Sequence, residues 1–90
     1  MTSKKRMPTI RGIIIPSRWD EDGNINAVSL HTSDEKEYRV DYGGVGKELL
    51  THIHHTVEVS GIIRERLDGR LYISVHSYMP LRDPVEERAV

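Results

Sequence analysis

The feature that most constrains the fold of this chain is the junction of a short helix and a strand between Val45 and Ile63. The segment VGKELLTHIHH places its apolar residues at helical spacing, at Val45, Leu49, Leu50 and Ile53. The next segment, TVEVSGII, alternates apolar and polar residues with the period of a half-buried strand. A helix of about ten residues does not persist alone in water. We therefore expect its apolar face to close one end of a small barrel.

Three strands are expected before this helix and one after the strand that follows it. Alternation and turn residues place them at about 9–18, 25–31, 36–42 and 71–79, with turns at 20–24, 32–35 and 67–70. The third strand is expected to bury Tyr38, Val40 and Tyr42. The last is expected to bury Leu71, Ile73, Val75 and Met79 and to expose Tyr72, Ser74, His76 and Tyr78. This order predicts an all-β, five-stranded Greek-key barrel with one short helix.

Two residues of the first strand predict local irregularities. Gly12 suggests a tight bend, because the first strand of a small barrel has to pair with both halves of the sheet. Pro16 cannot donate a backbone hydrogen bond, so we expect it at a bulge or at an unpaired end of the strand.

The length of 90 residues is that of one domain. We expect a flexible basic arm at 1–8, the barrel at 9–81 and a charged tail at 82–90. The chain has no cysteine, which excludes disulfides and thiolate metal sites and fits a reducing cytoplasm. The longest apolar run, Ile13 to Ile15, is far shorter than the roughly 18 residues of a membrane span. We expect a cytoplasmic protein that does not enter membranes.

The chain resembles the OB-fold superfamily between Thr9 and Leu81. The resemblance rests on Gly12, on the helix between the third and fourth strands, and on Val57-Glu58-Val59-Ser60-Gly61, which is similar to the V-x-V-x-G segment of many members. The chain looks most like small single-domain bacterial OB-fold proteins. The resemblance implies an oligonucleotide or oligosaccharide site on the outer face of strands two and three and on the flanking loops. Mapped onto this sequence, that surface holds Ser29, His31, Glu37, Arg39 and Asp41, with Arg18, Trp19, Asp20, Glu65, Arg66 and Asp68 in the loops.

Charge and aromatic content weigh against binding that depends on phosphates alone. Residues 12–81 contain seven basic and eleven acidic residues, a net charge of −4, whereas phosphate binders usually carry a basic stripe. The chain has no phenylalanine. Trp19 is the only stacking platform expected near the site, and it has a second interpretation, in which it folds back over the end of the barrel.

Two functions of different classes follow from these observations. The first is a non-enzymatic module that binds single-stranded DNA or RNA, with the basic arm as a further contact and with Arg18, Trp19, His31, Arg39, Arg64 and Arg66 as ligand-binding residues. The alternative is a protein–protein interaction module without a nucleic-acid ligand. It would meet a partner subunit or a second copy through an unpaired strand edge or through Tyr72, His76 and Tyr78. The spacing of histidines, carboxylates and glycines matches no catalytic motif, so we expect neither an enzyme nor a cofactor.

Two clusters have the residue types of metal ligands. His52, His54 and His55 suit zinc, nickel or copper, but histidines at the end of a helix also interact favourably with its dipole. Asp20, Glu21 and Asp22 lack the remaining ligands of a calcium loop and are expected to form a solvated turn. We expect no metal site at either cluster.

Overall fold

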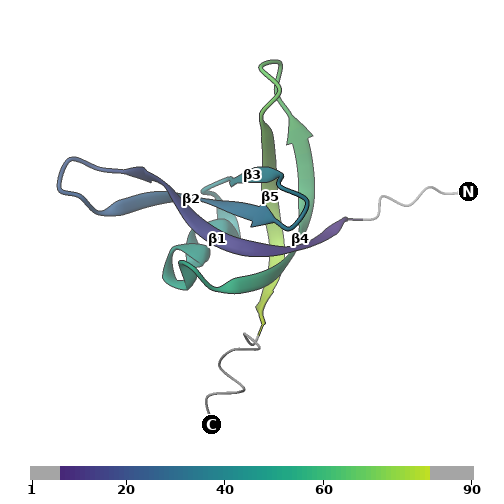
Figure 1. Ribbon diagram of the computed structural model, residues 1–90, viewed down its shortest axis with the longest axis horizontal. Helices are drawn as coiled ribbons and strands as arrows, with labels where there is room; N and C mark the ends of the chain where they lie inside the picture. The colour runs from purple at the N-terminus through teal and green to yellow at the C-terminus, as the bar shows by residue number, and fades with distance from the viewer. Residues whose placement is uncertain (1–6, 82–90) are drawn as a thin grey trace, which may run out of the picture.

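The computed structural model describes residues 7–81, which form a closed five-stranded barrel (Figure 1). Its elements are β1 (Thr9–Trp19), β2 (Ile25–Thr32), β3 (Glu37–Val40), the 3₁₀ helix η1 (Gly44–His52), β4 (Thr56–Glu65) and β5 (Leu71–Pro80). The strand order around the barrel is β1-β2-β3-β5-β4. β3 and β5 pair in parallel, and every other neighbouring pair is antiparallel. The predicted barrel, with one short helix between the third and fourth strands, is confirmed.

The predicted basic arm and charged tail lie mostly outside this description. Residues 1–6 of the arm and residues 82–90, the whole tail, are not among the described residues. Within residues 7–81, no helix is long and apolar enough to cross a membrane.

β1 closes the barrel by pairing on both of its edges at the same residues. Gly12 is the register partner of Thr32 in β2 and of Val57 in β4. A Cβ atom on Gly12 would lie 2.4 Å from the carbonyl oxygen of His31, so no larger residue fits at this crossing. Further along, the register with β2 shifts between Pro16 and Arg18. The predicted bulge beside Pro16 is confirmed, whereas at Gly12 the register runs without interruption and the glycine is required by the close approach of His31.

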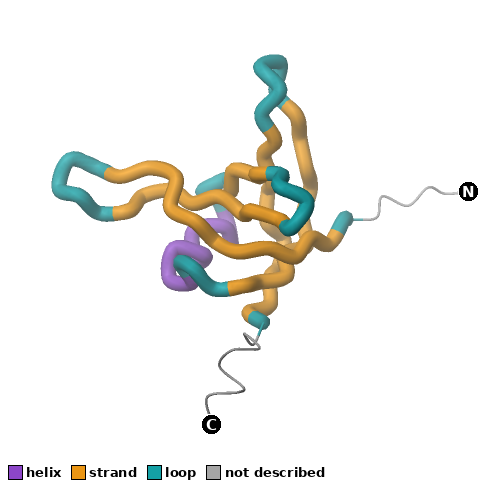
Figure 2. The backbone as a smooth tube through the Cα atoms, viewed as in Figure 1, coloured by secondary structure: helices purple, strands orange, loops and turns teal. Residues whose placement is uncertain are grey.

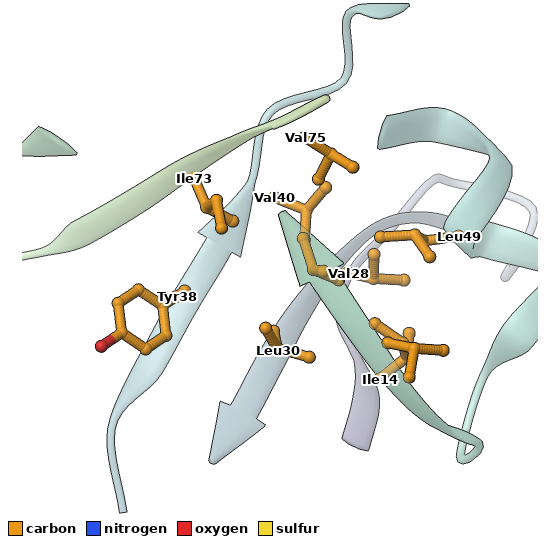
Figure 3. Packing of buried hydrophobic residues seen from close by; sticks show 10 residues of the cluster. Ile14, Val28, Leu30, Tyr38, Val40, Leu49, Ile73 and Val75 are labelled. Carbon is orange, nitrogen blue, oxygen red and sulfur yellow. The ribbon is translucent and has the colours of Figure 1, made fainter. Parts of the chain in front are cut away.

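The core fills the barrel with aliphatic side chains and one tyrosine (Figure 3). Its buried members are Ile14, Val28, Leu30, Tyr38, Val40, Leu49, Val57, Val59, Ile73 and Val75. η1 contributes Leu49, which has no exposed surface, and the partly buried side chains of Val45 and Leu50 pack beside it. Ile53, the residue after the helix, packs on the same core. The helix therefore buries the apolar face that the sequence predicts.

Tyr42 corrects the predicted third strand. Alternation places Tyr42 inward with Tyr38 and Val40, but β3 ends at Val40 and the Tyr42 side chain is 50% exposed. Gly43 and Gly44 follow it, and Gly44 has a positive φ of 59°. Because the chain leaves the sheet before Tyr42, strand alternation no longer decides which way this side chain points.

The end of β5 corrects the predicted fifth strand. Ser60 of β4 pairs with Ser77, but the next residue, Gly61, pairs with Val75. His76 is therefore an extra residue, and a β-bulge of this kind inverts the alternation beyond it. Tyr78, predicted to be exposed, packs against the core, whereas Met79, predicted to be buried, is 54% exposed.

Two hairpins project from the barrel, as the tube drawing shows (Figure 2). The β1–β2 turn is closed by Asp20, whose Oδ1 accepts from the backbone N–H groups of Asp22 and Asn24, both at 2.9 Å. The turn between β4 and β5 is built in a similar way, because Oδ1 of Asp68 accepts from the N–H of Arg70 at 3.0 Å. The acidic residues at 20–22 thus belong to a hydrogen-bonded turn, as predicted.

Candidate functional site

An open cleft of about 360 Å³ lies where the β1–β2 hairpin leaves the barrel. Residues from β1, β2 and β5 and from the end of β3 line it together. The polar and aromatic side chains in its wall include Arg18, Asn26, Arg39, Asp41, Tyr42 and Tyr72. A second hollow of about 260 Å³ shares Arg39 with this cleft and is also lined by Arg70. Cationic and aromatic groups therefore meet on one side of the barrel.

Tyr72 on β5 is surrounded by three arginines. The sheet register pairs it with Arg39 of β3 on one side and with Arg64 of β4 on the other. The guanidinium carbon of Arg66 lies 4.5 Å from the centroid of the Tyr72 ring, within the range of a cation–π contact. Because β3 runs parallel to β5, residues far apart in the sequence form one row across the outer face.

Asp41, just after β3, holds Arg64 in this row. Its Oδ2 accepts from Nη2 of Arg64 at 2.7 Å and from Oγ of Ser74 at 2.6 Å. The same Nη2 lies 3.3 Å from Oγ of Ser74, so the three side chains form a closed network. The Asp41 side chain keeps 30% of its surface exposed, and that of Arg64 keeps 63%. The network orients Arg64 and neutralises part of its charge without burying it.

Four of the six predicted ligand-binding residues gather around the cleft. Arg18 and Arg39 line it, and Arg64 and Arg66 flank Tyr72, which also lines it. His31 does not line the cleft; its Nε2 lies 3.7 Å from Oε2 of Glu37.

Trp19 is also absent from the cleft wall. It is 55% exposed and is not part of the core, so the hypothesis that it covers the end of the barrel is wrong. It lies at the end of β1, paired with Ile25, on the projecting hairpin.

Ser29 corrects the predicted outer surface. The sequence predicts it to be exposed on the ligand-binding face, but it is fully buried, and its Oγ has no hydrogen-bond partner among the described residues. The register places it between Ile15 of β1 and Arg39 of β3. Both neighbours are partly buried and have larger side chains, so the small serine between them is not reached by solvent.

Sequence reasoning missed the two tyrosines of the cleft. Alternation assigns Tyr42 to the core and Tyr72 to an aromatic stripe along β5. The Gly43-Gly44 pair is the signal that could have freed Tyr42 from strand alternation. For Tyr72 the deciding fact is the β3–β5 pairing, which brings it beside Arg39.

The aromatic stripe predicted along β5 is not a continuous surface. Tyr78 turns toward η1, and its hydroxyl donates to Oε1 of Glu48 at 3.0 Å. Its ring meets the ring of His52 edge-on, with centroids 5.4 Å apart. The hydrogen bond to Glu48 raises the pKa of Tyr78, and burial and the charge of Glu48 act in the same direction. Tyr78 therefore ties the helix to the barrel.

The histidines after η1 play a part in the backbone structure. The N–H of His54 donates to the carbonyl of Ile14 at 2.6 Å, and the carbonyl of His55 accepts from the N–H of Ile14 at 3.1 Å. The rings of His52 and His55 lie 6.0 Å apart, tilted against each other. Across residues 7–81, no three His, Asp or Glu side chains are placed to hold a metal ion together.

No protein-family model matches the chain, and a search of curated proteins found no relative.

Proposed function

We propose that this chain is a non-enzymatic binding module of the OB type, with single-stranded DNA or RNA as its ligand. The observation that carries the proposal is the row in which Arg39, Tyr72 and Arg64 lie side by side next to the open cleft. The strand order, the position of the helix and the two projecting hairpins (Figure 1) support the OB assignment.

The chemistry of the cleft suits an unpaired strand. Binders of single strands combine cationic groups along the backbone with aromatic rings on which the bases stack. Tyr42 and Tyr72 supply the rings, and Arg18 and Arg39 supply cations in the same wall. Although residues 12–81 are acidic in sum, Arg18, Arg39 and Arg70 line the cleft and the hollow beside it against two carboxylates, Asp41 and Glu37, so the local charge there is positive.

The test is a titration of fluorescently labelled single strands, followed by anisotropy at low and moderate salt. Oligonucleotides of about ten residues lie within the range of OB-fold site sizes. Tyr72→Ala should weaken binding by roughly 1–3 kcal/mol, the contribution of one stacked base, whereas Tyr72→Phe should retain most of the affinity. Circular dichroism would establish that both variants are folded. If the anisotropy of the labelled strands stays unchanged up to high micromolar concentrations of the wild-type protein, the proposal is ruled out.

A protein-interaction module is the second candidate, and the tips of the hairpins favour it. Leu67 in the β4–β5 turn is fully exposed, and Trp19 on the other hairpin is more than half exposed. Tryptophan is among the residue types enriched at protein interfaces. If the module acts in this way, replacing Leu67 with serine should abolish capture of a partner or self-association in size-exclusion chromatography. A strictly monomeric wild-type protein that captures no partner would speak against it.

A further inference from the structure

The cleft contains one carboxylate, Asp41, in a wall otherwise rich in arginine and tyrosine. Its Oδ2 accepts from Arg64 and Ser74. Among residues 7–81, Oδ1 has no hydrogen-bond partner. The network fixes the carboxylate in place and leaves one strong acceptor available.

The charge of Asp41 decides which part of a nucleic-acid strand can face it. A phosphate beside this carboxylate would be repelled, while Arg18 and Arg39 in the same wall attract phosphates. The strand should therefore turn its backbone toward the arginines and the edge of a base toward Asp41. Stacking on Tyr72 or Tyr42 would leave that edge free to meet the carboxylate.

We propose that Asp41 reads the hydrogen-bonding edge of a base, and that the cleft prefers bases with amino donors, guanine foremost, over uracil and thymine. This inference rests on the proposed function. Guanine offers two adjacent donors, N1–H and the N2 amino group, to a carboxylate. Uracil and thymine offer one N3–H between two carbonyl oxygens, which a carboxylate repels. Arg64, held beside Asp41, is a donor for the O6 acceptor of guanine.

Asn26 adds a second polar group to the same wall. Its Oδ1 is buried and has no hydrogen-bond partner among the described residues. This oxygen has no accessible surface, so the acceptor that a ligand in the cleft can reach is Asp41, whose side chain is 30% exposed.

The experiment compares three labelled oligonucleotides of equal length: thymidine alone, thymidine alternating with guanosine, and thymidine alternating with inosine. Inosine lacks only the N2 amino group. We expect the guanosine strand to bind about tenfold more tightly than the inosine strand, as one good base-edge contact predicts. The thymidine strand should bind most weakly. Equal affinity for all three strands would overturn this inference and leave the proposed function standing, whereas no binding to any strand would overturn both.

Asp41→Asn should bring the guanosine-to-inosine ratio close to one. Its matched control is Glu58→Gln, which neutralises another arginine-paired carboxylate, 3.7 Å from Arg11 and outside the cleft wall. The control should retain the wild-type ratio. If Asp41→Asn keeps the wild-type ratio of guanosine-strand to inosine-strand affinity, another group causes the preference for guanine and the proposed role of Asp41 is overturned. The wild-type comparison itself needs no variant, so it decides the base preference even where Asp41→Asn is unstable.

Discussion

Two glycines besides Gly12, one in η1 and one in β4, are required by close contact with neighbouring backbone. A Cβ atom on Gly46 would lie 2.1 Å from the carbonyl oxygen of Asp41, and one on Gly61 would lie 2.1 Å from that of Ser74. Neither acceptor is a flexible side chain that could move aside. At Gly46 the contact sets how closely η1 approaches the chain after β3, and so it also supports the position of Asp41 in the cleft.

Gly46→Ala is expected to destabilise the fold by about 1–3 kcal/mol, because overpacking forces the backbone apart. Gly43→Ala is the matched control: Gly43 has an ordinary φ of −71°, and a Cβ atom added there would meet no other atom within 4 Å. Urea denaturation would give both free energies of unfolding. Similar free energies of unfolding for the two variants would show that the close contact at Gly46 does not exclude a larger side chain.

The residue types of the cleft are visible in the sequence, but their grouping is not. Arg18, Arg39, Arg64 and Arg66 are predicted as ligand-binding residues because of their places on loops and outer faces, and the structure brings them to one cleft or its border. The role of Tyr42 depends on where β3 ends. That boundary is a matter of one or two residues, which sequence patterns do not define.

At the scale of elements, one inserted residue exchanges the two faces at the end of β5. Strand alternation places Leu71, Ile73 and Val75 on the inner side, as predicted. Beyond His76 the bulge exchanges the two faces, so Tyr78 points to the core and Met79 to solvent. Alternation carries no information about where a bulge occurs, because the position of a bulge depends on the partner strand.

The helix depends on burial for its stability. Leu49 is its one fully buried large side chain among the described residues, and a 3₁₀ helix of this length has little stability of its own. Leu49→Ala should cost about 2–5 kcal/mol of unfolding free energy, because it leaves a cavity in the core. Leu67→Ala, at a fully exposed position, should change stability by less than about 0.5 kcal/mol. Thermal or chemical denaturation would compare the unfolding free energies of the two variants. A small loss of stability in Leu49→Ala would contradict the burial of Leu49 in the core.

The contact between η1 and β5 predicts a dependence of stability on alkaline pH. The hydrogen bond to Glu48 raises the pKa of Tyr78, so the folded chain holds this proton more tightly than the unfolded chain. The resulting stabilisation is complete below the ordinary tyrosine pKa of about 10 and is lost as the pH rises through the raised value. Tyrosinate absorbance, with Tyr78→Phe as the difference control, would locate the transition. In Glu48→Gln the transition should move back toward the ordinary value, and an unchanged transition would contradict the assignment.

For the whole molecule, the distribution of charge matters more than its sum. Residues 12–81 have a net charge of −4, yet Arg18, Arg39 and Arg70 line two hollows that share a wall, and Arg64 and Arg66 flank Tyr72 beside them. A net charge describes the average field far from the protein. A ligand in the cleft responds to the nearby arginines instead, because salt screens charges more distant than about 8–10 Å.

Arg39→Ala should therefore lower the salt dependence of single-strand binding. Each lost phosphate contact reduces the slope of log K against log salt by about 0.7 for single strands. Lys47→Ala removes the same charge from η1, outside the cleft wall, and should leave the slope unchanged. Anisotropy titrations at several salt concentrations would measure both slopes. Equal reductions in the two variants would indicate a general effect of net charge and not a contact at Arg39.

The sequence by itself determined the kind and order of the elements, the lack of a side chain at Gly12 in the first strand, the bulge beside Pro16 and the apolar face of the helix. These are local properties, because periodicity, turn chemistry and the absence of a side chain act within a few residues. The tertiary structure decided which residues share the cleft. The parallel pairing of β3 with β5 brings Arg39, Tyr72 and Arg64 together, and the bulge at His76 turns Tyr78 inward. Both depend on contacts between distant segments, which local sequence patterns do not encode.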